Sequence, residues 1–92
     1  MANLYTFIMD YLGGTYISQF ECENKEQAMS LWIQNLEIEQ IERFSQKDKE
    51  KIIKKGFLDD DPGELTGIHN VWHFIVDTKE GTGFVNFVNT VK

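Results

Sequence analysis

The sequence predicts an α+β domain with the element order β-β-α-α-β-β, in which two hairpins form one antiparallel sheet and the helices pack on one face. Three observations predict it. The stretches 4–22 and 70–91 are rich in β-branched and aromatic residues, and each contains glycines near its middle. The stretch between them carries apolar residues at helical spacing. Because 92 residues suffice for one small domain, we assign residues 1–92 to a single globular domain.

The first hairpin is predicted from the adjacent glycines Gly13 and Gly14. A two-residue type I′ turn needs a positive φ at both central positions, which glycine tolerates. With this turn one face of the hairpin is aromatic and apolar, and the other is mixed. A phosphate-binding loop would need G-x-G-x-x-G between a strand and a helix, so we interpret the glycines as a turn. The predicted pairs on the apolar face are Leu12–Thr15, Tyr11–Tyr16, Met9–Ser18, Phe7–Phe20 and Tyr5–Cys22.

The second hairpin is predicted to turn at Glu80–Gly81, within the sequence KEGTG. Gly83 follows closely, so a longer turn remains an alternative. The predicted pairs on the apolar face are Phe74–Phe87 and Val76–Val85, with Trp72 on the same side.

The first of two predicted helices follows Asn24, which with Gln27 resembles a capping box. The segment EIEQIERF either continues this helix or forms a short second turn. The apolar residues at helical spacing, which we expect to cover the sheet, are Ala28, Met29, Leu31, Trp32, Ile33 and Leu36.

The second predicted helix spans residues 46–55. Ser45 with Asp48 is a start signal, and a glycine follows the segment directly. We expect Ile52 and Ile53 to anchor this helix.

Helices on one face leave the other, mixed face of the sheet without a cover. It carries more apolar surface than a solvated face usually shows, so we expect it to contact a second copy, in a homodimer, or a protein partner. The apolar residues of this face are Ile8, Ile17, Val71, Ile75, Phe84 and Val88.

Charge argues against some partners and for others. The net charge is −6, so the chain offers no broad basic face for nucleic acid or an anionic membrane. Residues 56–70 hold four acidic residues and no base. This segment is either a solvated loop or a docking surface for a basic partner. The four acidic residues are Asp59, Asp60, Asp61 and Glu64.

No catalytic or metal-binding set is visible in the sequence, and we expect neither an enzyme nor a bound cofactor. His69 and His73 have the spacing of a helical metal pair, but a strand would hold them about 13 Å apart. Cys22, the single cysteine, falls on the predicted apolar face, where thiols are usually inert.

The leading functional hypothesis is therefore a small acidic cytoplasmic module that binds a basic protein partner, as an inhibitor or immunity-type protein does. The cytoplasmic assignment follows from the single cysteine and from an N-terminus without a basic residue before Lys25, which differs from a signal peptide. The alternative is a small-molecule-binding domain or enzyme accessory subunit. Its pocket would lie between sheet and helices, near Tyr11, Tyr16 and His73.

Overall fold

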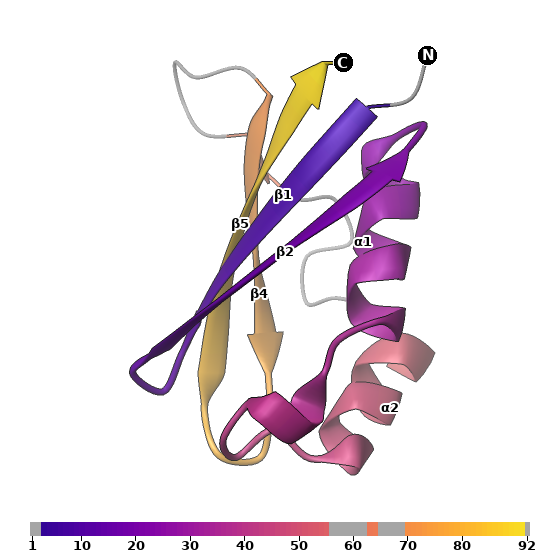
Figure 1. The fold of residues 1–92 in the computed structure, drawn as a ribbon. Coiled ribbons are helices and arrows are strands. Elements are labelled where there is room, and N and C mark those ends of the chain that lie inside the picture. The colour runs from indigo at the N-terminus through magenta and orange to yellow at the C-terminus, as the bar shows by residue number, and fades with distance from the viewer. Residues whose placement is uncertain (1–2, 56–62, 65–69, 92) are drawn as a thin grey trace.

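A computed structural model describes residues 3–55, 63–64 and 70–91. They form one antiparallel sheet of strand order β2-β1-β5-β4-β3, and both helices lie on the same side of it (Figure 1). The predicted α+β class and the order of hairpins and helices are confirmed. The elements are β1 (Asn3–Tyr11), β2 (Gly14–Cys22), α1 (Lys25–Gln34), the 3-10 turn η1 (Ile38–Gln40), α2 (Gln46–Lys55), β3 (Gly63–Glu64), β4 (Val71–Asp77) and β5 (Thr82–Val91).

The core lies between the sheet and the helices, and aromatic rings dominate it. Phe7 is fully buried at its centre, stacked on Phe87 from β5 and on Trp32 from α1. Phe20 and Phe74 meet the same ring edge-on from β2 and β4. One side chain therefore contacts three other strands and a helix, and the predicted burial of the aromatic face under α1 is confirmed.

The first turn lies one residue earlier than predicted. Tyr11 pairs with Gly14, so Leu12 and Gly13 occupy the turn, with φ of 46° and 85°. Gly14 is a strand residue instead, and it makes room for a neighbouring ring, because a Cβ there would lie 2.6 Å from the hydroxyl of Tyr16. The predicted pairs are wrong by two residues, so that Phe7 lies opposite Ser18. A shift of two keeps every side chain on its predicted face.

The second turn is also one residue earlier than predicted and centres on Lys79–Glu80, since the N–H of Thr78 donates to the carbonyl of Gly81. The Thr78 hydroxyl accepts from the N–H groups of Glu80 and Gly81, which stabilises a turn without a glycine at its centre. Val76 pairs with Gly83, where a Cβ would lie only 2.8 Å from the Val76 side chain. The absence of a side chain at Gly83 therefore makes room for Val76 in the core.

Helix α1 begins at the predicted cap. The Asn24 side chain accepts a hydrogen bond from the N–H of Gln27, and the Gln27 side chain accepts one from the N–H of Glu23. The helix ends at Gln34, and the following segment forms η1, so the shorter of the two alternatives for this region is confirmed.

Helix α2 spans the predicted residues and begins with a reciprocal cap. The Ser45 hydroxyl donates to Asp48 at 2.8 Å and accepts from the Asp48 N–H at 3.1 Å. The other Asp48 oxygen accepts from the N–H of Lys79, which ties α2 to the β4–β5 turn. Ile52 is buried as predicted, but Ile53 is 48% exposed, so its predicted role as an anchor is wrong.

Asp48 is buried, and burial alone would raise the pKa of its carboxyl group. Hydrogen bonds from the Ser45 hydroxyl, the Lys79 N–H and the Ser45 N–H outweigh burial, and Lys51 adds a favourable charge. The pKa is therefore lowered from its ordinary value of 3.8.

The turn geometry predicts opposite effects for two substitutions. Leu12→Asn should raise the free energy of unfolding by about 1 kcal/mol, because asparagine tolerates the left-handed conformation better than leucine. Gly13→Ala should lower it by about 1–2 kcal/mol, because any Cβ is strained at that φ. Urea denaturation measures both, and a loss of stability in Leu12→Asn with none in Gly13→Ala would contradict this turn.

The Asp48 contacts predict a pH-dependent stability. Asp48→Asn should lower the free energy of unfolding at pH 7 by about 1–3 kcal/mol, because the Ser45 and Lys79 donors lose their charged acceptor. The lowered pKa means that this contribution is present above the unfolded pKa and is lost as the pH falls below about 4. Urea melts at pH 7 and pH 3 should show the two proteins converging. A difference that stays constant with pH would contradict the assignment.

Candidate functional site

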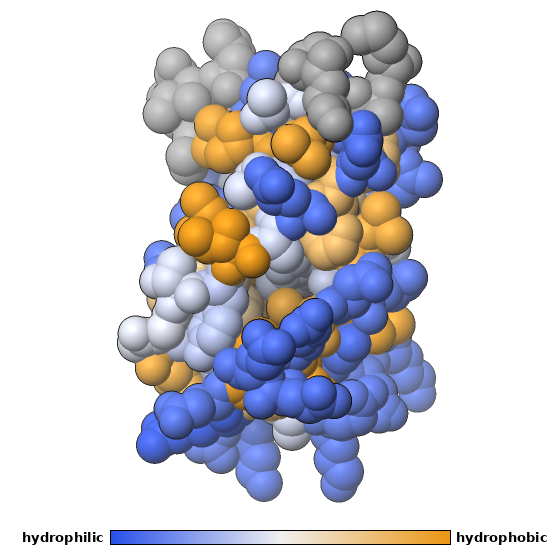
Figure 2. Space-filling view, in the orientation of Figure 1, coloured by the Kyte–Doolittle hydropathy of each residue, from blue (hydrophilic) through white to orange (hydrophobic). Residues whose placement is uncertain are grey.

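The uncovered face of the sheet carries all six apolar residues that the sequence predicted there. They form three cross-strand pairs: Ile8 with Ile17, Ile75 with Phe84, and Val71 with Val88. Ile17 and Phe84 are the most open to solvent, at 67% and 56% exposed, and the other four are partly exposed. No described helix packs on this face (Figure 1). Large apolar side chains in this position are typical of a contact surface. Figure 2 shows, in the orientation of Figure 1, how apolar and polar residues are distributed over one side of the molecule.

The same face is acidic at its margins. Strand alternation places Asp10, Glu21 and Asp77 on it, and no lysine or arginine of strands β1, β2, β4 and β5 shares it within the described residues. Asp10 and Asp77 accept hydrogen bonds from Thr15 and Thr82, which hold these two carboxylates on the surface. The face thus offers an apolar centre with negative charge around it.

The predicted acidic docking segment is described only in part. Asp59, Asp60 and Asp61 lie outside the described residues. Glu64 lies in β3, a two-residue strand that the sequence did not predict, and its backbone pairs with Trp72. The docking hypothesis for this segment stays a prediction.

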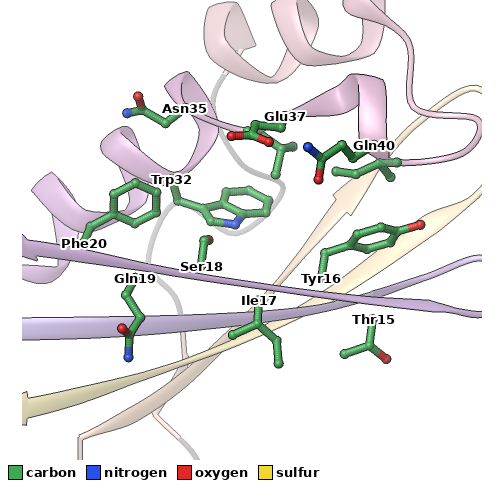
Figure 3. A pocket seen from close by; sticks show the side chains of 12 residues that line it. Thr15, Tyr16, Ile17, Ser18, Gln19, Phe20, Trp32, Asn35, Glu37 and Gln40 are labelled. Atoms are coloured by element: carbon green, nitrogen blue, oxygen red, sulfur yellow. The ribbon is translucent and has the colours of Figure 1, made fainter.

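A second surface feature is a hollow of about 550 Å³ between β2 and the segment from α1 to η1 (Figure 3). Three side chains of β2 face it from the helix side of the sheet, namely Tyr16, Ser18 and Phe20. Trp32 forms its floor, and Glu37 contributes the one charged side chain among its described lining residues. Tyr16 and Phe20 are large and Ser18 is small, so the wall is recessed at its centre. The opposite wall consists of Asn35, Leu36, Glu37, Gln40 and Ile41.

The hollow extends around the edge of the sheet. Thr15, Ile17 and Gln19 also line it, although their side chains point to the uncovered face (Figure 3). These three residues can therefore reach the hollow chiefly through their backbone, at the edge of β2. The hollow is a groove along a strand edge rather than a closed cavity, and we call it the β2 groove.

The predicted pocket is partly correct. Tyr16 lines the β2 groove. Tyr11 does not, because its ring is buried against Phe44 and its hydroxyl donates to the carbonyl of Arg43. His73 is exposed on the uncovered face, on the other side of the sheet, so its predicted place in the pocket is wrong.

The sheet also separates the groups that nucleophilic chemistry would need. Cys22 is buried on the helix side, and His73 lies on the uncovered side. Burial raises the pKa of the Cys22 thiol above its ordinary value of 9.0, a hydrogen bond with the backbone of Asn24 lowers it in part, and the charge of Glu23 raises it further. A thiol in this state is a poor nucleophile at neutral pH.

The described part of the chain offers no metal site of the usual kind. Residues 3–55, 63–64 and 70–91 contain no group of three or more histidine, cysteine, aspartate or glutamate side chains placed to hold a metal ion. These residues also contain no helix with the length and apolar character needed to cross a membrane. His69, the other histidine of the predicted pair, lies outside them.

Comparison with known proteins gave no match to a family model, a curated protein or a solved structure. The function therefore has to be inferred from the two surfaces described above, the uncovered face and the β2 groove.

The burial of Cys22 predicts slow chemical modification. Iodoacetamide should alkylate the native protein at least about tenfold more slowly than the urea-unfolded protein at pH 8, because the thiol is buried and its pKa is raised. Mass spectrometry of quenched samples measures the two rates. Equal rates would contradict the placement of Cys22 in the core.

Proposed function

We propose that this protein is a small interaction module whose uncovered sheet face binds a protein partner with an apolar centre and a basic rim. The observation that supports it most is the exposure of Ile17 and Phe84 on a face that no described helix covers. This extends the idea of an inhibitor or immunity-type protein, which acts by occupying a surface of its target rather than by chemistry.

Charge favours a different protein over a second copy as the partner. The uncovered face carries Asp10, Glu21 and Asp77 and, within the described residues, no lysine or arginine, so two copies packed face to face would bring like charges together. A partner with lysine or arginine around an apolar patch would complement it. The net charge of −6 adds a long-range attraction for such a partner.

The alternative, a small-molecule site, would use the β2 groove. Its volume of about 550 Å³ is in the range of small-ligand pockets. The groove is open along the strand edge, however, and most small-ligand sites enclose most of the ligand surface. The geometry therefore supports protein binding better.

Capture from a native lysate tests the proposal. The immobilised wild-type protein should retain a protein that the Phe84→Lys and Ile17→Lys variants lose, because each lysine removes apolar contact and repels a basic rim. Ile53→Lys is the matched control, since Ile53 is, like Ile17, an exposed isoleucine, but it lies on α2 and away from this face. Mass spectrometry identifies the retained proteins, and circular dichroism checks that all variants fold.

Three outcomes would overturn the proposal. One is the same set of retained proteins for the wild type and both face variants. Another is a wild-type dimer in analytical ultracentrifugation that Phe84→Lys converts to a monomer, because the face would then be occupied by a second copy. Loss of the captured protein by Ile53→Lys as well would equally contradict a role for this face.

A further inference from the structure

The edge of β2 differs from the other edge of the sheet. At the far side the sheet ends in β3, which is two residues long, whereas β2 is nine residues long. Natural edge strands usually carry lysine, proline or a bulge that prevents pairing with another chain. Residues 15–20 of β2 contain no charged residue and no proline, and their pairing with β1 has no bulge. This edge is therefore competent to pair with a further strand.

The register shows which backbone groups would make that pairing. A two-residue turn makes Tyr11 and Gly14 a hydrogen-bonded pair, so hydrogen-bonded and open pairs alternate along β2. Tyr16 and Ser18 bond to β1, and Thr15, Ile17 and Gln19 direct their N–H and C=O groups away from the sheet. These three residues line the β2 groove although their side chains point to the uncovered face.

We propose that the β2 groove binds an extended segment of the protein partner, which adds to the sheet as a further strand beside β2. The inference rests on the proposed interaction function and names a second surface for it. An added strand lies about 4.8 Å from β2 and repeats its side-chain spacing. Every second side chain of the segment enters the groove, and the others lie next to Ile17 on the uncovered face.

The groove indicates which side chains the segment carries. The recess at Ser18, between the rings of Tyr16 and Phe20 and above Trp32, fits one apolar side chain of the segment. Glu37, on the opposite wall, complements a lysine or arginine two positions away. A second copy would bring its own β2 and its own Glu37 to the groove, so like charge opposes pairing between copies.

The predicted direction of the β2 backbone N–H groups can be tested in the free protein. Amide hydrogen exchange, followed residue by residue by NMR, should show Thr15, Ile17 and Gln19 exchanging at least about tenfold faster than Tyr16 and Ser18, because only the latter two amides are hydrogen-bonded to β1. Equal protection along β2 in a dilute sample would overturn the inference. Protection of Ile17 that appears only at high protein concentration would assign the edge to a second copy and overturn it too.

A displayed library of random nine-residue peptides tests the occupant. Peptides selected on the wild-type protein should alternate apolar and polar residues and carry lysine or arginine, and they should protect the amides of Thr15, Ile17 and Gln19. Gln19→Pro removes one outward N–H from an edge position where proline is tolerated, and it should weaken these peptides at least about tenfold. Gln19→Ala is the matched control, because both variants lose the same hydrogen bond from Gln19 to Thr6 and only the alanine keeps the N–H.

Each outcome decides for or against the edge. Pairing at the β2 edge is supported if Gln19→Pro weakens peptide binding and Gln19→Ala does not. It also requires that Ser18→Leu, which fills the recess, blocks peptide binding. No selected peptide, acidic selected peptides, or equal binding to both Gln19 variants overturns it. The uncovered face is judged separately, since Phe84→Lys leaves the β2 groove intact and should keep the peptides while it loses the captured partner.

Discussion

The position of the Phe7 ring is the constraint on which the rest of this structure depends. The ring is stacked on Phe87 at 4.7 Å and on Trp32 at 5.8 Å, so it joins the centre of the sheet to α1. Because side chains alternate along a strand, an inward Phe7 forces Ile8 outward, and pairing transmits that choice to Ile17 in β2. The buried core and the exposed apolar face are thus two consequences of one alternation.

That alternation explains why the sequence predicted the faces better than the pairs. Both turns lie one residue earlier than predicted, because Gly14 and Gly81 flank the turns and make room for the Tyr16 and Leu12 side chains instead of standing at the turn centres. A glycine that accommodates a neighbouring side chain cannot be distinguished from a turn glycine by sequence alone. Each error shifts the register by two, an even number, so the predicted core and the predicted uncovered face both hold.

The helix starts could be predicted from the sequence, whereas the β2 groove could not. Asn24 and Ser45 interact with residues three positions away, and such local contacts are readable in sequence. The groove depends on how η1 lies against the edge of β2, which only the tertiary structure reveals. The prediction that His73 lies near the pocket is wrong, although strand alternation alone already puts His73 and Phe74 on opposite faces of the sheet. The prediction that Ile53 anchors α2 is wrong because this helix turns only its Asp48 and Ile52 side toward the core.

The helices cover the Phe7 side of the sheet and leave the Phe84 side open to a partner, and both proposed surfaces depend on that arrangement. Nuclear Overhauser contacts in solution test it most directly. The Phe7 ring should show contacts to Trp32 and Phe87, and the Phe84 ring should show none to α1 or α2. Contacts between the Phe84 ring and either helix would contradict this arrangement, because the face assigned to a partner would then be part of the core.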